Sequence, residues 1–356
     1  MTAAKRKRVD DDDDAAATDE CESGCREREV QVQSSSSHNN LPMLAFHHYK
    51  QGMFMYSISD RILHKKLDGH LSLDTKLYWS TPQGWMLIME HHPSRDKPSA
   101  AYLWNPSNGD ELPLPKVQED HRLSPIWRCL LSHKDPSHPG CVVVLVCSGE
   151  PAVWYCHTAG GGQWTRRSHE IPTRIFTVAS CGAKLHFINS RERIGTIDFP
   201  STPPAAADDD DQQQHPVIQY FDVPAIEFPN GMDSANSWLV ESHDQLFRVS
   251  IFFVGDDLGA VHVYKMDFSA RAWRRVRDIG DVVVFLEGYS DLAASCAASS
   301  LGLKANQIYF INSFCRDDGG YLYTFDLELD ILESIWVPRP QTLRCLLPFW
   351  IVPPGS

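Results

Sequence analysis

The sequence predicts an all-β protein, a β-propeller of about six blades with about four strands each. After residue 40 the apolar runs are short, rich in β-branched and aromatic residues, and bounded by Gly, Pro, Asn or Asp. Helical spacing of apolar residues is nearly absent. A hairpin pattern also returns at intervals of roughly 53 residues, which is the size of a propeller blade.

Short apolar runs of this composition are typical of strands rather than helices. The clearest are GWMLIME (84–90), CVVVLVC (141–147), SWLVE (237–241), LFRVSIFFVG (246–255), DVVVFLEG (281–288) and NQIYFIN (306–312). The most helix-like stretch, DLAASCAASSLGL (291–303), is rich in Ala but also carries small polar residues and Gly302. We expect it to form a loop or a short turn of helix.

The recurring hairpin consists of a strand that ends near an aromatic residue, a polar residue three positions later, a turn, and a second strand. Asn, Asp and His tolerate the backbone geometry of such turns, and the aromatic residue packs on one face of the strand. These residues are therefore expected to be structural markers of the repeat. The pairs are Tyr102 and Asn105, Trp154 and His157, Tyr264 and Asp267, and Tyr323 and Asp326.

The polar residues of these four pairs are separated by 52, 110 and 59 residues. The middle gap is close to two periods, so one copy of the hairpin is missing from it. We expect that copy at Thr196–Asp198 or at Tyr220–Asp222, with the low-complexity segment 201–216 inserted in the connecting loop. An earlier copy is expected at Phe54–Asp60.

A single blade cannot bury both faces of its sheet, so the units are expected to stack around an axis. Dividing residues 41–356 by the period gives about six blades, with five or seven also open. The apolar segment CLLPFWIVPP (345–354) is expected to supply a strand that closes the ring against the first blade. Two β-sandwich domains are the alternative, because aromatic-x-x-polar motifs also arise by chance in β proteins.

Residues 1–40 form a charged tail ahead of the propeller domain at 41–356. This tail carries a low-complexity composition with an acidic run at Asp10–Asp14, which buries too little apolar surface to offset its ordering entropy and predicts disorder. It also contains a cluster that resembles a nuclear import signal: Lys5, Arg6, Lys7 and Arg8. The expected location is nuclear, or nuclear and cytoplasmic. A merely solubilising tail of mixed charge is the alternative.

The formal net charge of −13 argues against a general nucleic-acid-binding protein, which needs a basic face. The best candidate for such a face is a single strand, on which alternation would gather Arg271, Trp273, Arg275 and Arg277. A solvated outer strand with Trp273 packed between blades is the other interpretation. No apolar run approaches the roughly 20 residues of a membrane span, so no membrane partner is expected.

The sequence contains no recognisable catalytic, cofactor-binding or metal-binding arrangement, and we expect no cofactor. Gly160–Gly162 lacks the Gly-Lys-Ser/Thr ending of a phosphate loop and is expected to be a hairpin turn. His47–His48 and His91–His92 are adjacent pairs, and neighbours on a strand point to opposite faces, so neither pair can easily bind one metal ion. A propeller hydrolase is therefore the least favoured function.

Several segments occur in an order that is informative as a set. Near the start these are LPMLAF (41–46), FMYSISD (54–60), STPQGWMLIM (80–89) and LWNPSNGDELPLP (103–115). Further on, residues 273–313 combine a strand ending in Gly-Asp, an apolar strand, a small-residue loop and an N-x-I-Y-F strand. In this order the segments resemble the plant KIB-type β-propeller domain family, formerly a plant domain of unknown function and often F-box-associated. The resemblance spans about residues 41–338.

The resemblance implies a platform for protein partners, which in F-box relatives recruits a substrate for ubiquitin transfer. No F-box pattern is visible in residues 1–40, so we regard attachment to a ubiquitin-ligase adaptor as doubtful. The expected function is a non-enzymatic protein-interaction module whose partner the sequence does not identify. A nuclear nucleic-acid-associated or regulatory factor is the alternative.

Overall fold

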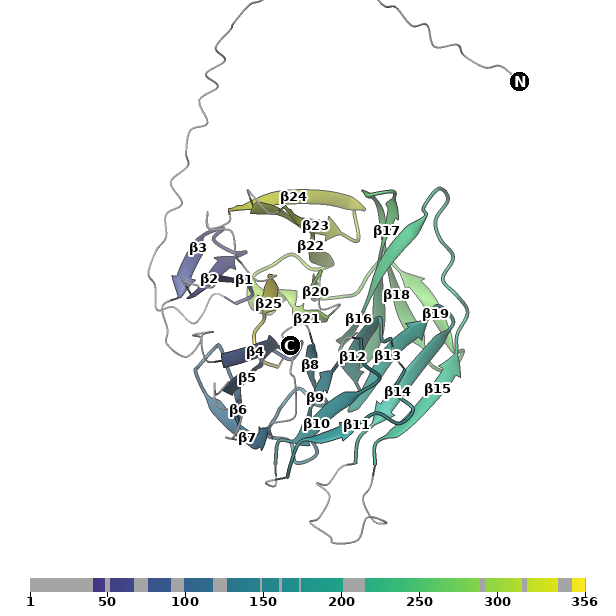
Figure 1. The fold of residues 1–356 in the computed structure, drawn as a ribbon. Helices are drawn as coiled ribbons and strands as arrows, with labels where there is room; N and C mark the ends of the chain where they lie inside the picture. Colours follow the sequence, from purple (N-terminus) through teal and green to yellow (C-terminus); the bar gives the residue numbers. More distant parts are fainter. Residues whose placement is uncertain are drawn as a thin grey trace, which may run out of the picture. The chain divides into compact units, whose positions relative to one another are not determined.

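The computed structural model describes residues 41–48, 52–66, 76–90, 99–117, 127–147, 149–159, 162–172, 174–200, 215–288, 292–315, 319–338 and 348–355. Within these ranges the chain forms 25 strands and one short helix. The strands assemble into six sheets, as Figure 1 shows. This confirms the predicted six-bladed, all-β fold. The tail 1–40, with Lys5–Arg8, and residues 201–214 lie outside the described residues.

Each sheet is one blade. The first contains β25 (Phe349–Ile351), β1 (Met43–His48), β2 (Gly52–Ser57) and β3 (Leu63–Lys66). The second contains β4 (Lys76–Ser80), β5 (Met86–Glu90), β6 (Ser99–Trp104) and β7 (Glu111–Val117). The third contains β8 (Arg128–Leu131), β9 (Val142–Val146), β10 (Val153–His157) and β11 (Thr165–Arg167).

The remaining blades follow in chain order. The fourth contains β12 (Thr177–Cys181), β13 (Lys184–Ser190), β14 (Arg193–Asp198) and β15 (Val217–Asp222). The fifth contains β16 (Ser234–Ser242), β17 (Gln245–Val254), β18 (Asp257–Asp267) and β19 (Ala272–Val276). The sixth contains β20 (Val282–Leu286), β21 (Ala293–Ala297), β22 (Gln307–Cys315), β23 (Gly319–Asp326) and β24 (Ile331–Pro338).

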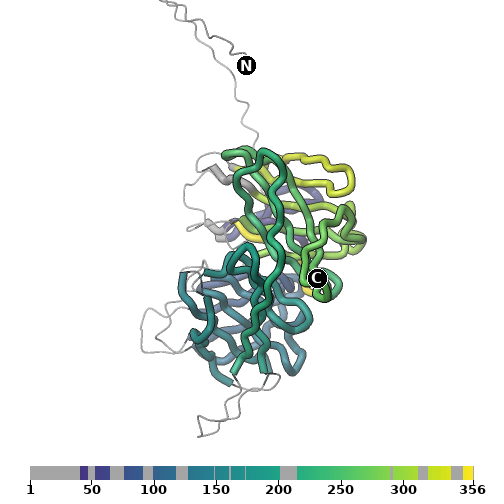
Figure 2. Tube along the Cα trace, turned by 90° about the vertical axis from the view of Figure 1, so that its right-hand side faces the viewer, coloured from purple at the N-terminus to yellow at the C-terminus, as the bar shows by residue number. Residues whose placement is uncertain are grey.

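The ring is closed by a strand from the end of the chain. β25 pairs antiparallel with β1, with Met43 opposite Ile351 and Ala45 opposite Phe349. The yellow β25 lies beside the purple first blade in Figures 1 and 2. This confirms the prediction that the segment 345–354 supplies a closing strand.

The sixth blade departs from the simple pattern. Its strand order is β21-β20-β22-β23-β24, and β20 runs parallel to β22 while all other pairs in the blade are antiparallel. The prediction of a loop or helical turn at 291–303 was therefore partly wrong. Ala293–Ala297 form strand β21, and only Ala298–Leu301 form helix α1, which ends at Gly302 in the left-handed conformation (φ 63°). This helix is far too short to cross a membrane, and the described residues contain no helix that could.

The core lies between blades rather than in one centre. Each of six apolar clusters joins two successive blades; one, for example, joins Phe46 of the first blade to Phe285 of the sixth. The strands that contribute most are buried on both faces, as β9 and β20 are along their whole length. Six interfaces arranged in a closed cycle exclude the alternative of two separate β-sandwiches.

Candidate functional site

The polar residues of the predicted repeat all lie where the last strand but one of a blade meets the turn to its outermost strand. Asn105 follows β6, and Asp267 and Asp326 are the last residues of β18 and β23. In all three the side-chain oxygen Oδ1 accepts a hydrogen bond from the backbone N–H two or three residues ahead, at 2.9 Å in Asn105. These residues therefore fix the turn through their side chains.

His157 occupies the same position in the third blade without making that bond. It is the last residue of β10, it is 3% exposed, and neither ring nitrogen has a hydrogen-bond partner in the described part of the chain. Burial lowers the pKa of His157, so the ring is neutral at physiological pH. In the fourth blade Asp198 ends β14, so Thr196–Asp198, not Tyr220–Asp222, is the missing copy of the repeat.

The aromatic residues of the repeat fill the spaces between blades. Trp154 is part of the cluster between the second and third blades, and Tyr323 packs against the cluster between the fifth and sixth. Tyr102 packs between the first and second blades. Tyr264 is different, because it is 8% exposed but lies among polar groups.

The sheet register around Tyr264 builds a polar surface on the fifth blade. Paired residues of neighbouring strands point to the same face, and Arg248, Tyr264 and Arg275 are paired in one row across β17, β18 and β19. The next row on that face holds Ser237, Ser250 and His262. We call these six residues the Arg248 patch. None of them carries a carboxylate.

Hydrogen bonds hold the members of the Arg248 patch in place. Nη2 of Arg248 donates to Ser237 Oγ at 3.1 Å, and Ser237 Oγ lies 2.9 Å from Ser250 Oγ. Nδ1 of His262 and the hydroxyl of Tyr264 form a bond of 3.2 Å. Nε of Arg248 is buried and has no partner among the described residues. One donor of a charged group is therefore left unused.

The electrostatic environment of Arg248 is unusual for an arginine. Burial lowers its pKa to about 10; Tyr264 raises it slightly, and the positive charge of Arg191 from the fourth blade lowers it further. The group remains protonated at neutral pH. Burial and the neighbouring Arg275 also lower the pKa of His262, so that ring is neutral.

Apolar residues border the patch on both sides. Toward one end, Leu239, Leu246, Met266 and Trp273 belong to the cluster between the fourth and fifth blades. Toward the other, the ring of Phe252 contacts His262 at a centroid distance of 5.1 Å, and Phe228 contacts Phe252 at 5.3 Å. The guanidinium of Arg191 lies over the ring of Phe228, 5.1 Å from its centroid.

The structure corrects the prediction that four residues share one strand face. β19 spans only Ala272–Val276, so Arg271, in the preceding turn with φ 48°, and Arg277 lie outside it. Trp273 and Arg275 do share a face, and Trp273 packs in the cluster between blades four and five. The expected packing of Trp273 between blades is thus present.

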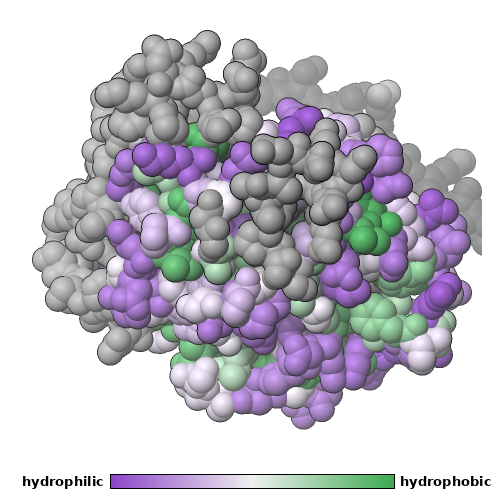
Figure 3. All heavy atoms as spheres, turned by 90° about the horizontal axis from the view of Figure 1, so that it is seen from below, coloured by the Kyte–Doolittle hydropathy of each residue, from purple (hydrophilic) through white to green (hydrophobic). Residues whose placement is uncertain are grey.

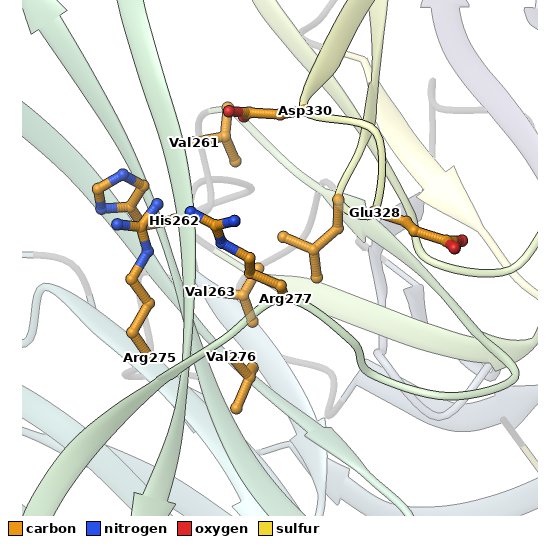
Figure 4. Close-up of a pocket in the computed structure, with 9 residues that line it drawn as sticks. Val261, His262, Val263, Arg275, Val276, Arg277, Glu328 and Asp330 are labelled. Atoms are coloured by element: carbon orange, nitrogen blue, oxygen red, sulfur yellow. The ribbon is translucent and has the colours of Figure 1, made fainter.

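A groove of about 310 Å³, open solvent included, lies between the fifth and sixth blades. Val261, Val263, Val276 and Leu327 supply its apolar lining. Figure 4 shows the side chain of Arg277 on the side of Val263, with Asp330 across from it and the carboxylate of Glu328 turned away, whereas Arg275 lies beside His262 on the other side of the strand. Neither arginine forms an ion pair among the described residues.

Beyond this groove, the outer strands of the sixth blade expose apolar side chains. β24 is the outermost strand and pairs only with β23 in the described sheets. The ring of Trp336 contacts that of Tyr321, its neighbour across the strands, at 5.2 Å. The exposed residues, here called the β24 surface, are Tyr321 (46%), Leu329 (57%), Ile331 (48%), Leu332 (39%) and Trp336 (46%). On the side of the molecule drawn in Figure 3, by contrast, apolar residues form separate groups among hydrophilic ones.

One buried carboxylate, which sequence reasoning did not single out, joins the blades near the axis. Oε1 of Glu287 accepts hydrogen bonds from the Ser80 hydroxyl at 3.0 Å and from the backbone N–H of Trp350 at 3.1 Å. The backbone carbonyl of Glu287 accepts a bond from Nε1 of Trp238 at 2.8 Å. The residue is 7% exposed and thereby ties the sixth blade to the first, second and fifth. Its role is structural.

Among the described residues, no group of three or more His, Cys, Asp or Glu side chains could hold a metal ion. The side chains of His47 and His48, all of His91–His92, and Gly160 and Gly161 lie outside the described residues.

Six small sheets closed in a ring by a strand from the end of the chain define a β-propeller. The family model described as "KIB1-4 beta-propeller" matches residues 55–330, and the chain belongs to that family. This confirms the family resemblance that the order of the sequence segments indicated. No curated protein sequence matches the chain.

Solved structures resemble the chain only distantly. A protein from Lactobacillus plantarum has 12% identity and a TM-score of 0.41, covering 86% of this chain and 99% of its own. A putative 6-phosphogluconolactonase from Bacteroides uniformis has 10% identity and a TM-score of 0.39, covering 85% and 83%. Virginiamycin B lyase from Staphylococcus aureus has 12% identity and a TM-score of 0.32, covering 77% and 74%.

Proposed function

We propose that the protein is a non-enzymatic interaction module that binds a partner protein at the β24 surface. The observation that carries this proposal is the set of five apolar side chains, each 39–57% exposed, on and beside the outermost strand of one blade. Tyr321, Leu332 and Trp336 share one face of the sheet by register, and exposed apolar residues gathered on one face mark interaction sites in soluble proteins. An outermost strand also offers unpaired backbone groups to an extended segment of a partner.

The charges beside this surface favour a particular kind of segment. Arg277 enters the adjoining groove and forms no ion pair among the described residues. A segment with apolar side chains against Leu332 and Trp336 and an acidic residue near Arg277 would satisfy both features. In F-box relatives the propeller recruits substrates for ubiquitin transfer, and we include this role in the proposal as one context for such a partner.

Proximity labelling in intact plant cells tests this function. The variant combines Leu332→Ser with Trp336→Ser, and the matched control combines Val217→Ser with Phe268→Ser, which are also exposed apolar residues. We expect the first variant to lose a set of labelled proteins that the control retains. Equal labelling by the two variants would refute the proposed surface. Recovery of a cullin adaptor in the wild-type set would establish ligase membership, and its absence would leave the interaction module alone.

Nuclear import through Lys5–Arg8 is a separate part of the proposal. It is supported by the uninterrupted run of four basic residues in the tail. A fluorescent fusion carrying Lys5→Ala, Arg6→Ala, Lys7→Ala and Arg8→Ala should shift from the nucleus to the cytoplasm. An unchanged distribution would refute import through Lys5–Arg8 and leave the proposal for the β24 surface unaffected.

A further inference from the structure

We propose that the Arg248 patch, together with Arg191, is a binding site for a phosphate monoester group. The site lies between the fourth and fifth blades and is distinct from the β24 surface. The inference goes beyond the proposed protein–protein contact, because the site would take the phosphoryl group whichever molecule carries it.

The first support is the imbalance of charge. Arg191, Arg248 and Arg275 bring three positive charges to one place, while the six patch residues bring no carboxylate. This occurs in a chain with a formal net charge of −13. Withdrawing a guanidinium from water without a counter-charge is costly, so a partly buried arginine usually has an acidic partner.

Other arginines of the same region do have such partners. Nε of Arg193 lies 3.1 Å from Asp222 Oδ1, and Nε of Arg274 lies 3.8 Å from Asp267 Oδ2. These are exposed, where pairing is least needed. Arg248 is the more buried group, yet it forms no ion pair among the described residues. A bound anion would supply the negative charge that no side chain of the Arg248 patch provides.

The second support is a set of hydrogen-bond donors that are either unpaired or able to turn toward a ligand. Nε of Arg248 is buried without a partner, beside an Nη2 that is already fixed by Ser237. A guanidinium held in this way presents parallel N–H groups that match two oxygens of a phosphate. The hydroxyl of Tyr264 lies in the row of Arg248 and that of Ser250 in the adjoining row, and the exposed Arg275 stands at the outer end. The rings of Phe228 and Phe252 border the site through their contacts with Arg191 and His262.

The site favours a monoester over a nucleic-acid backbone for two reasons. A monoester carries up to two negative charges on one group, which suits three clustered guanidiniums. A nucleic acid needs a long basic track, and the acidic chain offers only this local cluster. Binding to single-stranded DNA is thus an alternative outcome of the test rather than part of the proposal.

Calorimetric titration of the full chain tests the site with three probes: inorganic phosphate, a phosphoserine peptide with its unphosphorylated twin, and a single-stranded oligonucleotide. Arg248→Gln removes the charge and Arg275→Gln removes the exposed rim charge without disturbing the core. Arg193→Gln, whose partner is Asp222, is the matched control. We expect each of the first two variants to weaken phosphate or phosphopeptide binding at least tenfold, and the control to leave it within twofold.

The possible results distinguish a phosphorylated protein from a small phosphorylated molecule, and both of these from a nucleic acid. Tighter binding of the phosphopeptide than of phosphate supports a protein ligand, and equal binding supports a small phosphorylated molecule; both support the site. No binding of either monoester, binding that is equal in Arg248→Gln and the control, or binding of the oligonucleotide alone overturns it. A merely structural Arg248 would instead show lower stability in Arg248→Gln without ligand. If that variant fails to fold, Arg275→Gln decides the question.

Discussion

The hydroxyl of Ser80 donates a hydrogen bond of 3.0 Å to Oε1 of Glu287, although 207 residues separate the two along the chain. The same oxygen receives the backbone N–H of Trp350, so one carboxylate connects three blades. A buried group bonded in this way cannot be removed without leaving its donors unpaired.

We expect Glu287→Ala to lower the free energy of unfolding by about 2–3 kcal/mol, because the Ser80 hydroxyl and the Trp350 N–H lose their acceptor. Glu287→Gln should cost less, since its amide oxygen can accept the same bonds. Urea unfolding followed by tryptophan fluorescence measures both. Glu328→Ala, at an exposed turn, is the control and should change stability by less than about 0.5 kcal/mol. A loss in Glu287→Ala no larger than in the control would contradict this role.

Two tryptophans offer a matched test of ring closure. Trp350 is 2% exposed on the closing strand β25, and its Nε1 donates to the carbonyl of Leu286 at 3.0 Å. Trp336 is 46% exposed on β24. Trp350→Ala should cost about 3–5 kcal/mol because it leaves a cavity between the first and sixth blades. Trp336→Ala should cost less than about 1 kcal/mol. Similar losses in thermal denaturation would show that β25 does not secure the ring.

Two glycines with nearly the same backbone angle differ in their surroundings. Gly84 (φ 84°) has the backbone of Pro353 within 2.5 Å of where a Cβ would stand, whereas Gly109 (φ 82°) has nothing within 4 Å. Gly109→Ala should cost about 1–2 kcal/mol from the left-handed backbone alone. Gly84→Ala should add about 1–3 kcal/mol, because the added methyl must displace the segment that follows β25. If urea unfolding shows the same loss of stability for Gly84→Ala and Gly109→Ala, the segment after β25 moves aside without cost.

The turn carboxylates predict a loss of stability in acid. Hydrogen bonds from the N–H of Ala270 and the hydroxyl of Ser269 lower the pKa of Asp267, and similar bonds from Ser299 lower that of Asp281. A lowered folded-state pKa contributes stability that is complete above the unfolded value of 3.8 and is lost as the pH falls through the folded value. The midpoint of urea unfolding should therefore decrease as the pH falls below about 4.

Asp267→Asn separates the charge from the turn geometry, because Asn105 shows that an amide oxygen supports the same kind of turn. This variant should fold at pH 7 and show a shallower loss of stability in acid. Asp256→Asn, in the turn between β17 and β18, serves as the control and should keep the wild-type slope. If stability decreases with falling pH at the same rate in all three proteins, Asp267 does not contribute to the loss of stability in acid.

Turn chemistry made much of the fold predictable. Asn105, Asp267 and Asp326 mark the end of the last strand but one of a blade, because their side chains bond the backbone just ahead, and that signal is local. Their spacing gave the period and hence six blades. Strand β21 was not predicted because its residues, AASCA, have little preference for strands. Its position near the axis favours small side chains. The parallel pairing of β20 and β22 leaves no local signal either.

The candidate sites were harder to foresee for a related reason. Arg248, Tyr264 and Arg275 lie on three consecutive strands and become one row only through the register of those strands. Tyr264 was recognised as a repeat position, yet its polar neighbours were not. Glu287 resembles any charged residue after an apolar strand, and only the folded ring shows what it bonds.

The pairing of β25 with β1 also sets an order of events during synthesis. The inner edge of the first blade stays without its neighbour until residue 351 has left the ribosome, however early β1 to β3 are made. Until then the nascent chain exposes an unpaired strand edge on the first blade, and the apolar clusters on both sides of that blade are incomplete. A chaperone that shields such edges would therefore act longest on the oldest part of this polypeptide.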